Sequence, residues 1–298
     1  MAPDPHPRPI DRVFAAYALI SALALLFPHH GFIWPALVTI HLLAAAAALR
    51  LPPMRRVTVA VTHARPRFAR AVHDWYALAL VPALYTEVAV LNQAVWNGRY
   101  FDPVIQHVEA TVFGGQPSRQ LAAALPYPVL SEFLHAAYLS YYLVIFGPSV
   151  VLYVMGRVHA FRVVTFGVVL TFLLSYVVFI FFPVQGPRYL FPAPDGALAG
   201  GLVNRASHWL LEHGSARGAA FPSSHMGVAT VQAVLAYRYM RPVFPLFVLI
   251  ALALGFGAIY SGFHYATDMV VGAFAGVVLG LLVPRVYVML GRQEPTAP

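Results

Sequence analysis

Eight long apolar segments constrain this chain more than any other feature of its sequence. They cover approximately residues 13–27, 32–49, 73–92, 129–154, 161–183, 223–240, 243–261 and 265–288. A helix needs about 20 mostly apolar residues to cross the hydrocarbon core of a bilayer. Of the 298 residues, 60% are hydrophobic and 10% are charged, which is more apolar surface than a soluble domain of this length can bury. We therefore expect an all-α polytopic membrane bundle with about eight transmembrane helices.

The arginines predict the orientation of this bundle, because positively charged short loops stay in the cytoplasm. All 19 basic residues are arginine, and with eight crossings most of them fall on one side. That set is Arg8, Arg12, Arg50, Arg55, Arg56, Arg65, Arg67, Arg70, Arg157, Arg162, Arg238, Arg241, Arg285 and Arg292. Both termini are therefore expected in the cytoplasm, with the protein in the plasma (inner) membrane. Membrane placement also accounts for the net charge of +8, so we expect no nucleic-acid partner.

The expected organisation has three parts. Residues 1–72 hold two transmembrane helices and a basic cytoplasmic loop, residues 73–290 hold a six-helix core, and residues 291–298 are a cytoplasmic tail. No small-x-small cleavage site follows the first apolar segment, so we interpret it as an uncleaved helix rather than a signal peptide. The chain has no cysteine, which excludes disulfides and thiolate chemistry.

Two segments on the non-cytoplasmic side need their own interpretation. In Tyr100–Pro126, a set of apolar residues falls on one helical face, with Glu109 off it, which predicts a short interfacial helix ending at Gly114 and Gly115. This set is Val104, Ile105, Val108, Val112 and Phe113. The second segment, from about 183 to 221, is rich in Gly and Pro, and we expect a long functional loop there.

Three polar clusters fall on the same side of the predicted membrane. They are "VQGPRYLFP" with Arg188, "FPSSHM" with His225, and "YSGFHYATDMVVG" with His264 and Asp268. The first two are joined by the long loop with no crossing between them. The second and third are joined by one helix in and one helix out. The span count alone therefore places all three clusters at the non-cytoplasmic surface.

His264 and Asp268 are four residues apart at the start of the last predicted helix. At this spacing the carboxylate accepts a hydrogen bond from one imidazole nitrogen, which makes the other nitrogen a better nucleophile or base. A purely structural pair is the competing interpretation. Ionisable groups inside a membrane span are costly and usually functional, which favours a catalytic role.

The other two clusters allow both structural and chemical interpretations. Ser223 and Ser224 suit a helix N-cap, while free amides at a helix start also bind anions. His225 is either a packing histidine or a proton donor to a leaving group. Arg188 is either an ordinary interfacial arginine or a bidentate ligand for phosphate oxygens. Together these groups fit phosphoryl transfer better than any of them does alone.

Several other residues keep more than one interpretation. Glu87 and Glu132 lie in apolar spans, where each either touches a substrate head group or bonds a neighbouring helix. The tyrosines of "AYLSYY" suit an aromatic belt better than a lipid groove; these are Tyr138, Tyr141 and Tyr142. Glycines spaced by four in the last span favour close helix packing; these are Gly272, Gly276 and Gly280.

At these clusters the sequence resembles the type 2 phosphatidic acid phosphatase superfamily. Its three signatures correspond here to "GPRY", "PSSH" and "HYATD", in the family's order, and the resemblance covers about residues 75–290. Finer features resemble its inositol-phosphotransferase-like branch, which includes fungal inositol phosphorylceramide synthases. These features are "GPRY", "FGGQPS" at Phe113–Ser118 and "SEFLHAAYLSYY" at Ser131–Tyr142.

The resemblance implies a role for each matching residue. His264 attacks phosphorus to form a phosphohistidine, Asp268 orients it, and His225 protonates the leaving alkoxide. The phosphate oxygens are bound by Arg188 with Ser223 and Ser224. Water or a polyol or sugar acceptor then resolves the intermediate. The implied substrate is a lipid phosphate, and no metal or other cofactor is implied.

The chain also departs from the superfamily's common pattern. The usual first signature begins with Lys, and the usual third signature has Ser-Arg before the histidine, where this chain has Gly257 and Ala258. Two phosphate-binding cations are therefore missing, which leaves open whether Arg205 or Arg217 replaces them.

Other functions compete with a lipid phosphoesterase or phosphotransferase. A transporter or flippase suits eight helices with intramembrane acids, although transport sites usually lie near the middle of the bilayer. A metal site made of two histidines and a carboxylate is a further possibility. A vanadate-dependent haloperoxidase, related by signature, is disfavoured because the chain is a membrane protein without lysine.

Overall fold

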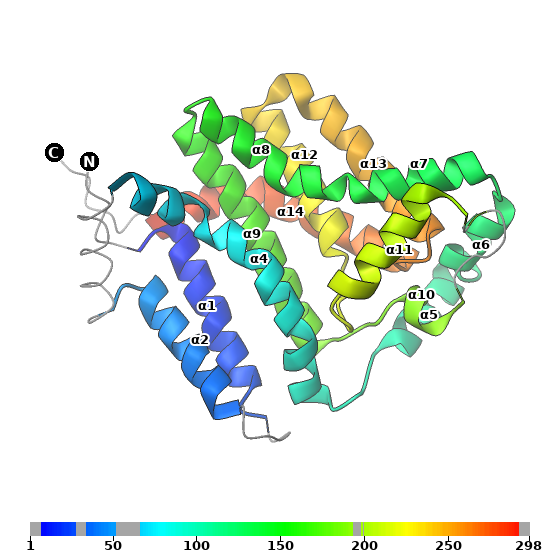
Figure 1. Cartoon of the computed structure of the whole chain (residues 1–298), viewed down its shortest axis with the longest axis horizontal. Coiled ribbons are helices and arrows are strands. Elements are labelled where there is room, and N and C mark those ends of the chain that lie inside the picture. The colour runs from blue at the N-terminus through cyan, green and yellow to red at the C-terminus, as the bar shows by residue number, and fades with distance from the viewer. Residues whose placement is uncertain (1–6, 28–33, 52–65, 193–197, 199, 292–298) are drawn as a thin grey trace.

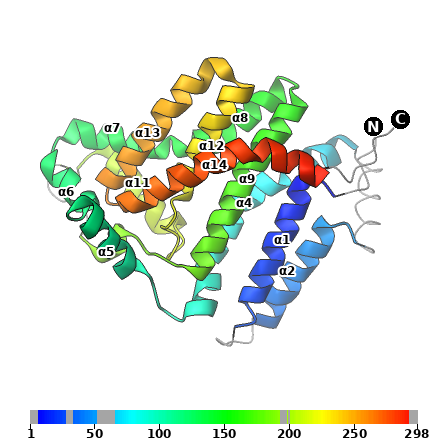
Figure 2. The same ribbon diagram turned by 180° about the vertical axis from the view of Figure 1, so that it is seen from behind.

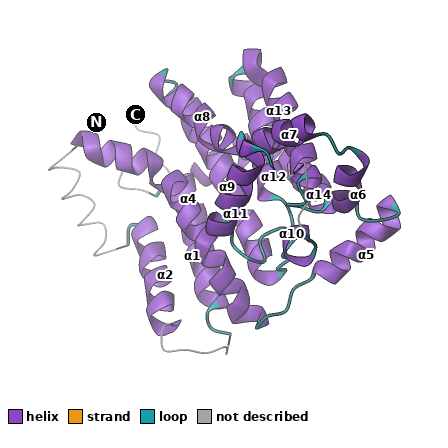
Figure 3. Cartoon of the chain, turned by 45° about the vertical axis from the view of Figure 1, so that its right-hand side comes forward, coloured by secondary structure: helices purple, strands orange, loops and turns teal. Residues whose placement is uncertain are grey.

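The computed structural model describes residues 7–27, 34–51, 66–192, 198 and 200–291, and these residues are organised as helices (Figures 1 and 3). The first half contains α1 (Pro9–Ala24), α2 (Trp34–Ala48), α4 (Pro66–Trp96), α5 (Asp102–Phe113), α6 (Pro117–Ala124), α7 (Pro128–Leu139) and α8 (Tyr141–Val154). The second half contains α9 (Val158–Phe181), α10 (Pro187–Leu190), α11 (Leu202–Gly214), α12 (Ser224–Tyr239), α13 (Phe244–Tyr260) and α14 (Ala266–Gly291). Extended pairing within the described ranges is limited to one isolated bridge, between Val184 and Ala219. The expected all-α class is confirmed.

Five of the described segments are long and apolar enough to cross a membrane. They are Ala71–Trp96, Pro128–Val154, Val158–Phe181, Arg241–Tyr260 and Ala266–Gly291. The helix α2 is a shorter apolar helix, and α1 and α12 have 16 residues each. A helical membrane bundle is therefore confirmed, whereas the count of eight crossings stays a prediction. Arg55, Arg56, Arg65, Arg292 and the tail after residue 291 lie outside the described residues.

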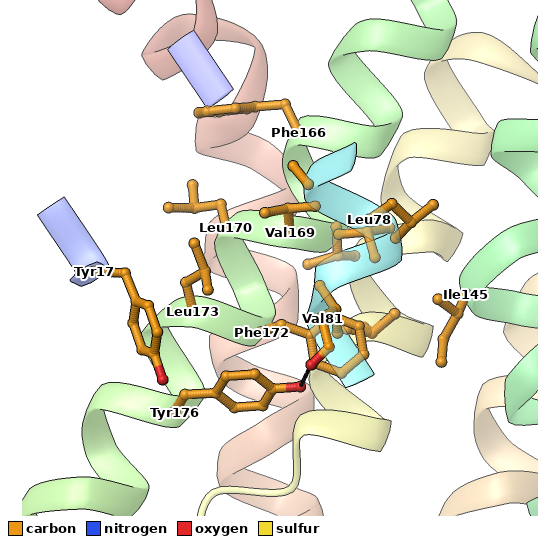
Figure 4. Packing of buried hydrophobic residues seen from close by; sticks show 14 of the residues in the cluster. Tyr17, Leu78, Val81, Ile145, Phe166, Val169, Leu170, Phe172, Leu173 and Tyr176 are labelled. Carbon is orange, nitrogen blue, oxygen red and sulfur yellow. Dashed lines mark hydrogen bonds between the residues drawn. The ribbon is translucent and has the colours of Figure 1, made fainter. Parts of the chain in front are cut away.

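The helix α9 runs through the centre of the bundle and is buried along most of its length. It packs against α1, α4, α8, α12 and α14. Its apolar sequence, without a polar face, is what such an enclosed helix requires. Near its end, the hydroxyl of Tyr176 donates to the carbonyl of Val81 in α4 at 3.2 Å (Figure 4).

The first two helices form an antiparallel pair beside this core, and α1 also contacts α4 and α9 (Figure 1). The imidazole of His41 in α2 lies 3.3 Å from the carboxylate of Glu87 in α4. Glu87 therefore bonds a neighbouring helix, which is one of the two roles that the sequence left open for it.

The helices α5, α6, α10 and α11 gather at one end of the bundle (Figures 1 and 2). The other end is marked by Gly291, where an added Cβ would lie 3.8 Å from Pro9, so α14 ends beside the start of α1. A helix of 26 residues is about 39 Å long, so α14 begins far from that point. The three signature clusters lie at this far end.

The segment from 183 to 221 is not simply a loop, because it contains the 13-residue helix α11. The carboxylate of Glu132 in α7 accepts hydrogen bonds from the backbone amides of Val203 and Asn204, both at 2.9 Å. These amides have no partner within their own helix, and a carboxylate at a helix start is favourable. Glu132 thus bonds a neighbouring helix. The prediction of a loop was wrong at α11 because its cap comes from a distant part of the chain.

Candidate active site

Close packing between α12 and α14 brings the second and third clusters together. A Cβ added at Gly272 would lie 2.5 Å from the carbonyl oxygen of Ser223, and one added at Gly276 would lie 2.5 Å from that of Gly227. Only glycine allows the two backbones to approach this closely. The amide of Ser223 donates to the backbone carbonyl of Asp268 at 3.1 Å, so the start of α12 is fixed to the start of α14.

The structure places His264 beside Asp268. The Nδ1 atom of His264 lies 3.2 Å from Oδ2 of Asp268, and both side chains are buried. The same oxygen accepts the backbone amide of Tyr265 at 3.0 Å. His264 lies in the turn before α14 rather than within the helix, yet the carboxylate still reaches it. This geometry leaves Nε2 of His264 as the nitrogen available for chemistry.

His225 lies next to His264, with 5.5 Å between the ring centroids. Two tyrosines enclose it: the hydroxyl of Tyr138 is 3.2 Å from Nε2 of His225, and the Tyr141 ring centroid is 4.0 Å away. The Nδ1 atom of His225 is buried and has no hydrogen-bond partner among the described residues. One nitrogen is therefore held by a tyrosine, and the other is unoccupied.

The two serines mark the start of α12. The Oγ of Ser223 accepts the amide of Met226 at 3.3 Å, which makes Ser223 the N-cap that the sequence predicted. Ser224 is the first residue of the helix, and both serines are buried. The helix start therefore presents its backbone amides beside His225, in the arrangement that favours an anion.

The first cluster is fixed to the other two through Gly186. A Cβ at this position would lie 3.1 Å from Ala220 and 3.2 Å from the carbonyl of Phe263, next to His264. Its φ of +92° also favours glycine. Arg188 follows in α10, where one guanidinium nitrogen donates to the carbonyl of Leu211 at 3.2 Å. The other terminal nitrogen, Nη1, is buried and lacks a partner in the described part of the chain.

One face of α5 holds the first and third clusters in place, which sequence reasoning missed. The carboxylate of Asp102 accepts the amides of Gln185 and Gly186, both at 2.9 Å, and the hydroxyl of Tyr265 at 3.1 Å. Glu109 accepts the amide of Thr267 at 3.0 Å, at the first turn of α14. Asp102 and Glu109 are seven residues apart, so their shared helical face was a signal available in the sequence.

The opposite face of α5 is exposed and apolar, with Val104, Val108, Val112 and Phe113 on it. The predicted helix is confirmed, and it ends at Gly114, whose left-handed conformation terminates it. Ile105 differs from the other members of the predicted face because it is buried against Tyr265 and its neighbours.

A cavity of about 580 Å³ opens beside Arg188, between α6, α10 and α11. Arg119 lines this cavity, whereas Arg205 and Arg217 are absent from its described lining. Arg217 instead donates to Gln185 at 3.2 Å. Neither of the two arginines suggested by the sequence therefore stands in this cavity, and a different arginine, Arg119, does.

The described residues contain no group of three or more His, Asp or Glu side chains placed to hold a metal ion. His225, His264 and Asp268 are neighbours, but they do not converge on a common point. The arrangement of two imidazoles and one oriented carboxylate therefore suits nucleophilic and acid–base chemistry.

Fold and site together define a helical membrane protein with a buried histidine–carboxylate centre at one end of its bundle. A family model for the PAP2 superfamily matches residues 104–282, a range that includes all three signature clusters. The chain therefore belongs to the PAP2 superfamily, which is the superfamily that its motifs indicate. Membership supports a reaction of phosphoric esters. Neither the curated proteins nor the solved structures contain a significant match to the chain.

Proposed function

We propose that this protein is an integral membrane lipid phosphoesterase or phosphotransferase that works through a phosphohistidine on His264. The observation that carries this proposal is the buried pair of His264 and Asp268, 3.2 Å apart, with His225 beside it. The carboxylate fixes the proton of His264 on Nδ1, which leaves the Nε2 lone pair free to attack phosphorus.

In the first half-reaction, Nε2 of His264 forms a bond to phosphorus, and the bond between phosphorus and the leaving alcohol oxygen breaks. His225 gives its proton to that oxygen. If the Tyr138 hydroxyl donates to Nε2 of His225, this proton sits on Nδ1, the nitrogen without a partner. In the second half-reaction, His225 takes a proton from water or an acceptor alcohol. The resulting oxygen attacks phosphorus and breaks the bond to His264.

The phosphate oxygens would be held by three groups on the protein. These are the amides at the start of α12, the hydroxyls of Ser223 and Ser224, and the unpartnered Nη1 of Arg188. Helix amides and a guanidinium stabilise the charge that develops on transferring phosphoryl groups. The proposal needs no metal ion or other cofactor.

We place the site at the non-cytoplasmic face of the plasma (inner) membrane, with both chain termini in the cytoplasm. The distribution of arginines supports this orientation. The clustering of polar groups at one end of the bundle also favours an enzyme over a transporter or flippase, for which a site near the middle of the bilayer is expected.

The test is phosphate release by the purified full chain from phosphatidate in mixed micelles. We expect His264→Ala to abolish it, and His213→Ala, at an exposed position on α11, to retain it. Rapid quenching in alkali should trap label on wild-type protein but not on His264→Ala. Vanadate should inhibit and EDTA should not. Substantial activity in His264→Ala would refute the mechanism, and loss of activity with EDTA would favour a metal site.

The same assay with added acceptors separates hydrolase from phosphotransferase. Inorganic phosphate as the only product indicates a hydrolase, whereas a new phosphodiester in the presence of a polyol or sugar indicates transfer. The motifs shared with the inositol-phosphotransferase-like branch support transfer to such an acceptor.

A further inference from the structure

The cavity beside Arg188 is much larger than the phosphate site requires. Its volume is about 580 Å³, within the range of small-molecule sites. A water molecule takes up about 30 Å³ in the liquid, so the cavity has room for a group several times larger than a phosphate. The lining includes Ser261 and Gly262, which lie just before His264 in the chain. The cavity therefore borders the proposed reaction centre.

Buried polar atoms of the lining residues lack partners. The Oγ atoms of Ser118 and Ser261 and the Nη1 atom of Arg188 have no hydrogen-bond partner among the described residues. Ser118 and Ser261 are only 4% and 3% exposed. Leaving such a buried group unpaired costs about 1–3 kcal/mol. Hydroxyls that satisfied no internal structure would be unusual here unless a polar ligand paired with them.

The charged residues of the lining carry both signs. The guanidinium of Arg119 lies 4.7 Å above the ring of Phe191, and Glu212 and His208 approach from α11. Burial is the main cause that lowers the pKa of His208, so its imidazole is neutral at neutral pH. Arg119 and Arg188 therefore supply positive charge, and Glu212 supplies negative charge.

This lining excludes several classes of ligand. An acyl chain would leave the serine hydroxyls and the charged groups without partners. A second anionic group would be repelled by Glu212, and a cationic head group by Arg119 and Arg188. A neutral group with several hydroxyls matches the cavity, because each hydroxyl both donates and accepts hydrogen bonds.

We propose that this cavity binds a neutral polyhydroxylated group next to the phosphate, with Arg119 and Glu212 as the residues that select it. The inference rests on the proposed function, since the phosphate held by Arg188 fixes where this group lies. Two sources share this chemistry: the head group of a lipid phosphodiester and a free acceptor alcohol. In either case the group lies beside the phosphorus–oxygen bond that breaks or forms.

Two activity ratios separate the sources. The first compares kcat/KM for phosphatidylinositol with kcat/KM for phosphatidate. The second compares transfer with hydrolysis when phosphatidate is the donor and free myo-inositol the acceptor. Glu212→Gln and Arg119→Gln should lower the first ratio at least tenfold if the head group occupies the cavity, and the second if the acceptor does. His213→Gln, on the same helix but outside the cavity, is the matched control and should change neither ratio.

A binding measurement keeps this test independent of the chemistry. Saturation-transfer NMR on full-length His264→Ala should detect myo-inositol or glycerol at the protein, and adding Glu212→Gln should remove the signal. The inference is overturned if neither ratio changes, if both substrates lose activity in proportion, or if binding survives Glu212→Gln. Phosphatidate turnover by wild type that persists in His264→Ala would instead contradict the proposed function, whatever the binding result.

Discussion

The hydroxyl oxygen of Tyr138 lies 3.2 Å from Nε2 of His225, and this contact joins α7 to the start of α12. Tyr138 and Tyr141 are 4% and 6% exposed and both contact His225, so they are not part of an aromatic belt. Tyr142, in contrast, is 48% exposed. In the proposed mechanism Tyr138 is a positioning residue, because it fixes the orientation and tautomer of the proton donor without touching substrate.

Replacing Tyr138 with Phe should lower kcat by about tenfold or more, with a smaller change in KM, because outer partners that fix a catalytic group typically contribute 10–100-fold. The pH–rate profile should also shift, since the proton affinity of His225 changes when its partner is lost. A structural role alone would leave the shape of that profile intact. Tyr142→Phe is the control, and equal effects of the two variants would contradict the assignment.

Asp102 should be essential for holding the first cluster, because its carboxylate accepts two backbone amides and one hydroxyl. Asp102→Ala would leave the amides of Gln185 and Gly186 unpaired, at a cost of about 1–3 kcal/mol each. We expect a lower melting temperature in detergent and a large fall in kcat/KM. Tyr265→Phe removes only one bond to the same carboxylate and should have a smaller effect on both. A kcat/KM for Asp102→Ala close to that of wild type would show that the cluster is held in another way.

Much of this arrangement could be predicted from local sequence patterns. The apolar segments give the helices, and the 3.6-residue period gives α5 and its end at Gly114. The spacing of His264 and Asp268 also anticipates their contact. These features depend on residues close together in the chain, where helical geometry fixes which side chains meet.

The rest depends on contacts between distant segments. The helix α11 takes its N-terminal cap from Glu132, about 70 residues earlier, and no local signal marks that pairing. Tyr138 reaches His225 across 87 positions. The cavity lined by Arg119 likewise forms only when α6, α10 and α11 come together. Apolar periodicity identifies buried faces but does not say which polar group on one helix meets which on another.

The contact between Gly272 and Ser223 predicts opposite effects for one substitution at two positions. Gly272→Ala places a Cβ 2.5 Å from a backbone oxygen and should destabilise the protein by about 1–3 kcal/mol. It should also lower activity, because it displaces the start of α12. Gly147→Ala, in α8, meets no atom within 4 Å and should be neutral or stabilise by up to about 1 kcal/mol. Melting temperature and kcat measured on both variants check this, and a loss of stability at Gly147 equal to that at Gly272 would contradict it.

Glu109 should make the stability of the protein depend on pH. Burial raises the pKa of its carboxyl above the ordinary value of 4.5, despite the amide of Thr267 that it accepts. The folded state therefore holds this proton more tightly than the unfolded state. The resulting stability is complete below about pH 4.5 and is lost as the pH rises through the raised value.

Glu109→Gln cannot titrate and keeps an acceptor oxygen for Thr267. The melting temperature of wild type relative to Glu109→Gln should therefore fall by a few degrees as the pH rises from about 4 to 8. Val112→Ala, on the exposed face of the same helix, should show an offset that does not vary with pH. A difference between wild type and Glu109→Gln that grows with pH would mean that the charged carboxylate is the favoured form, stabilised by the start of α14.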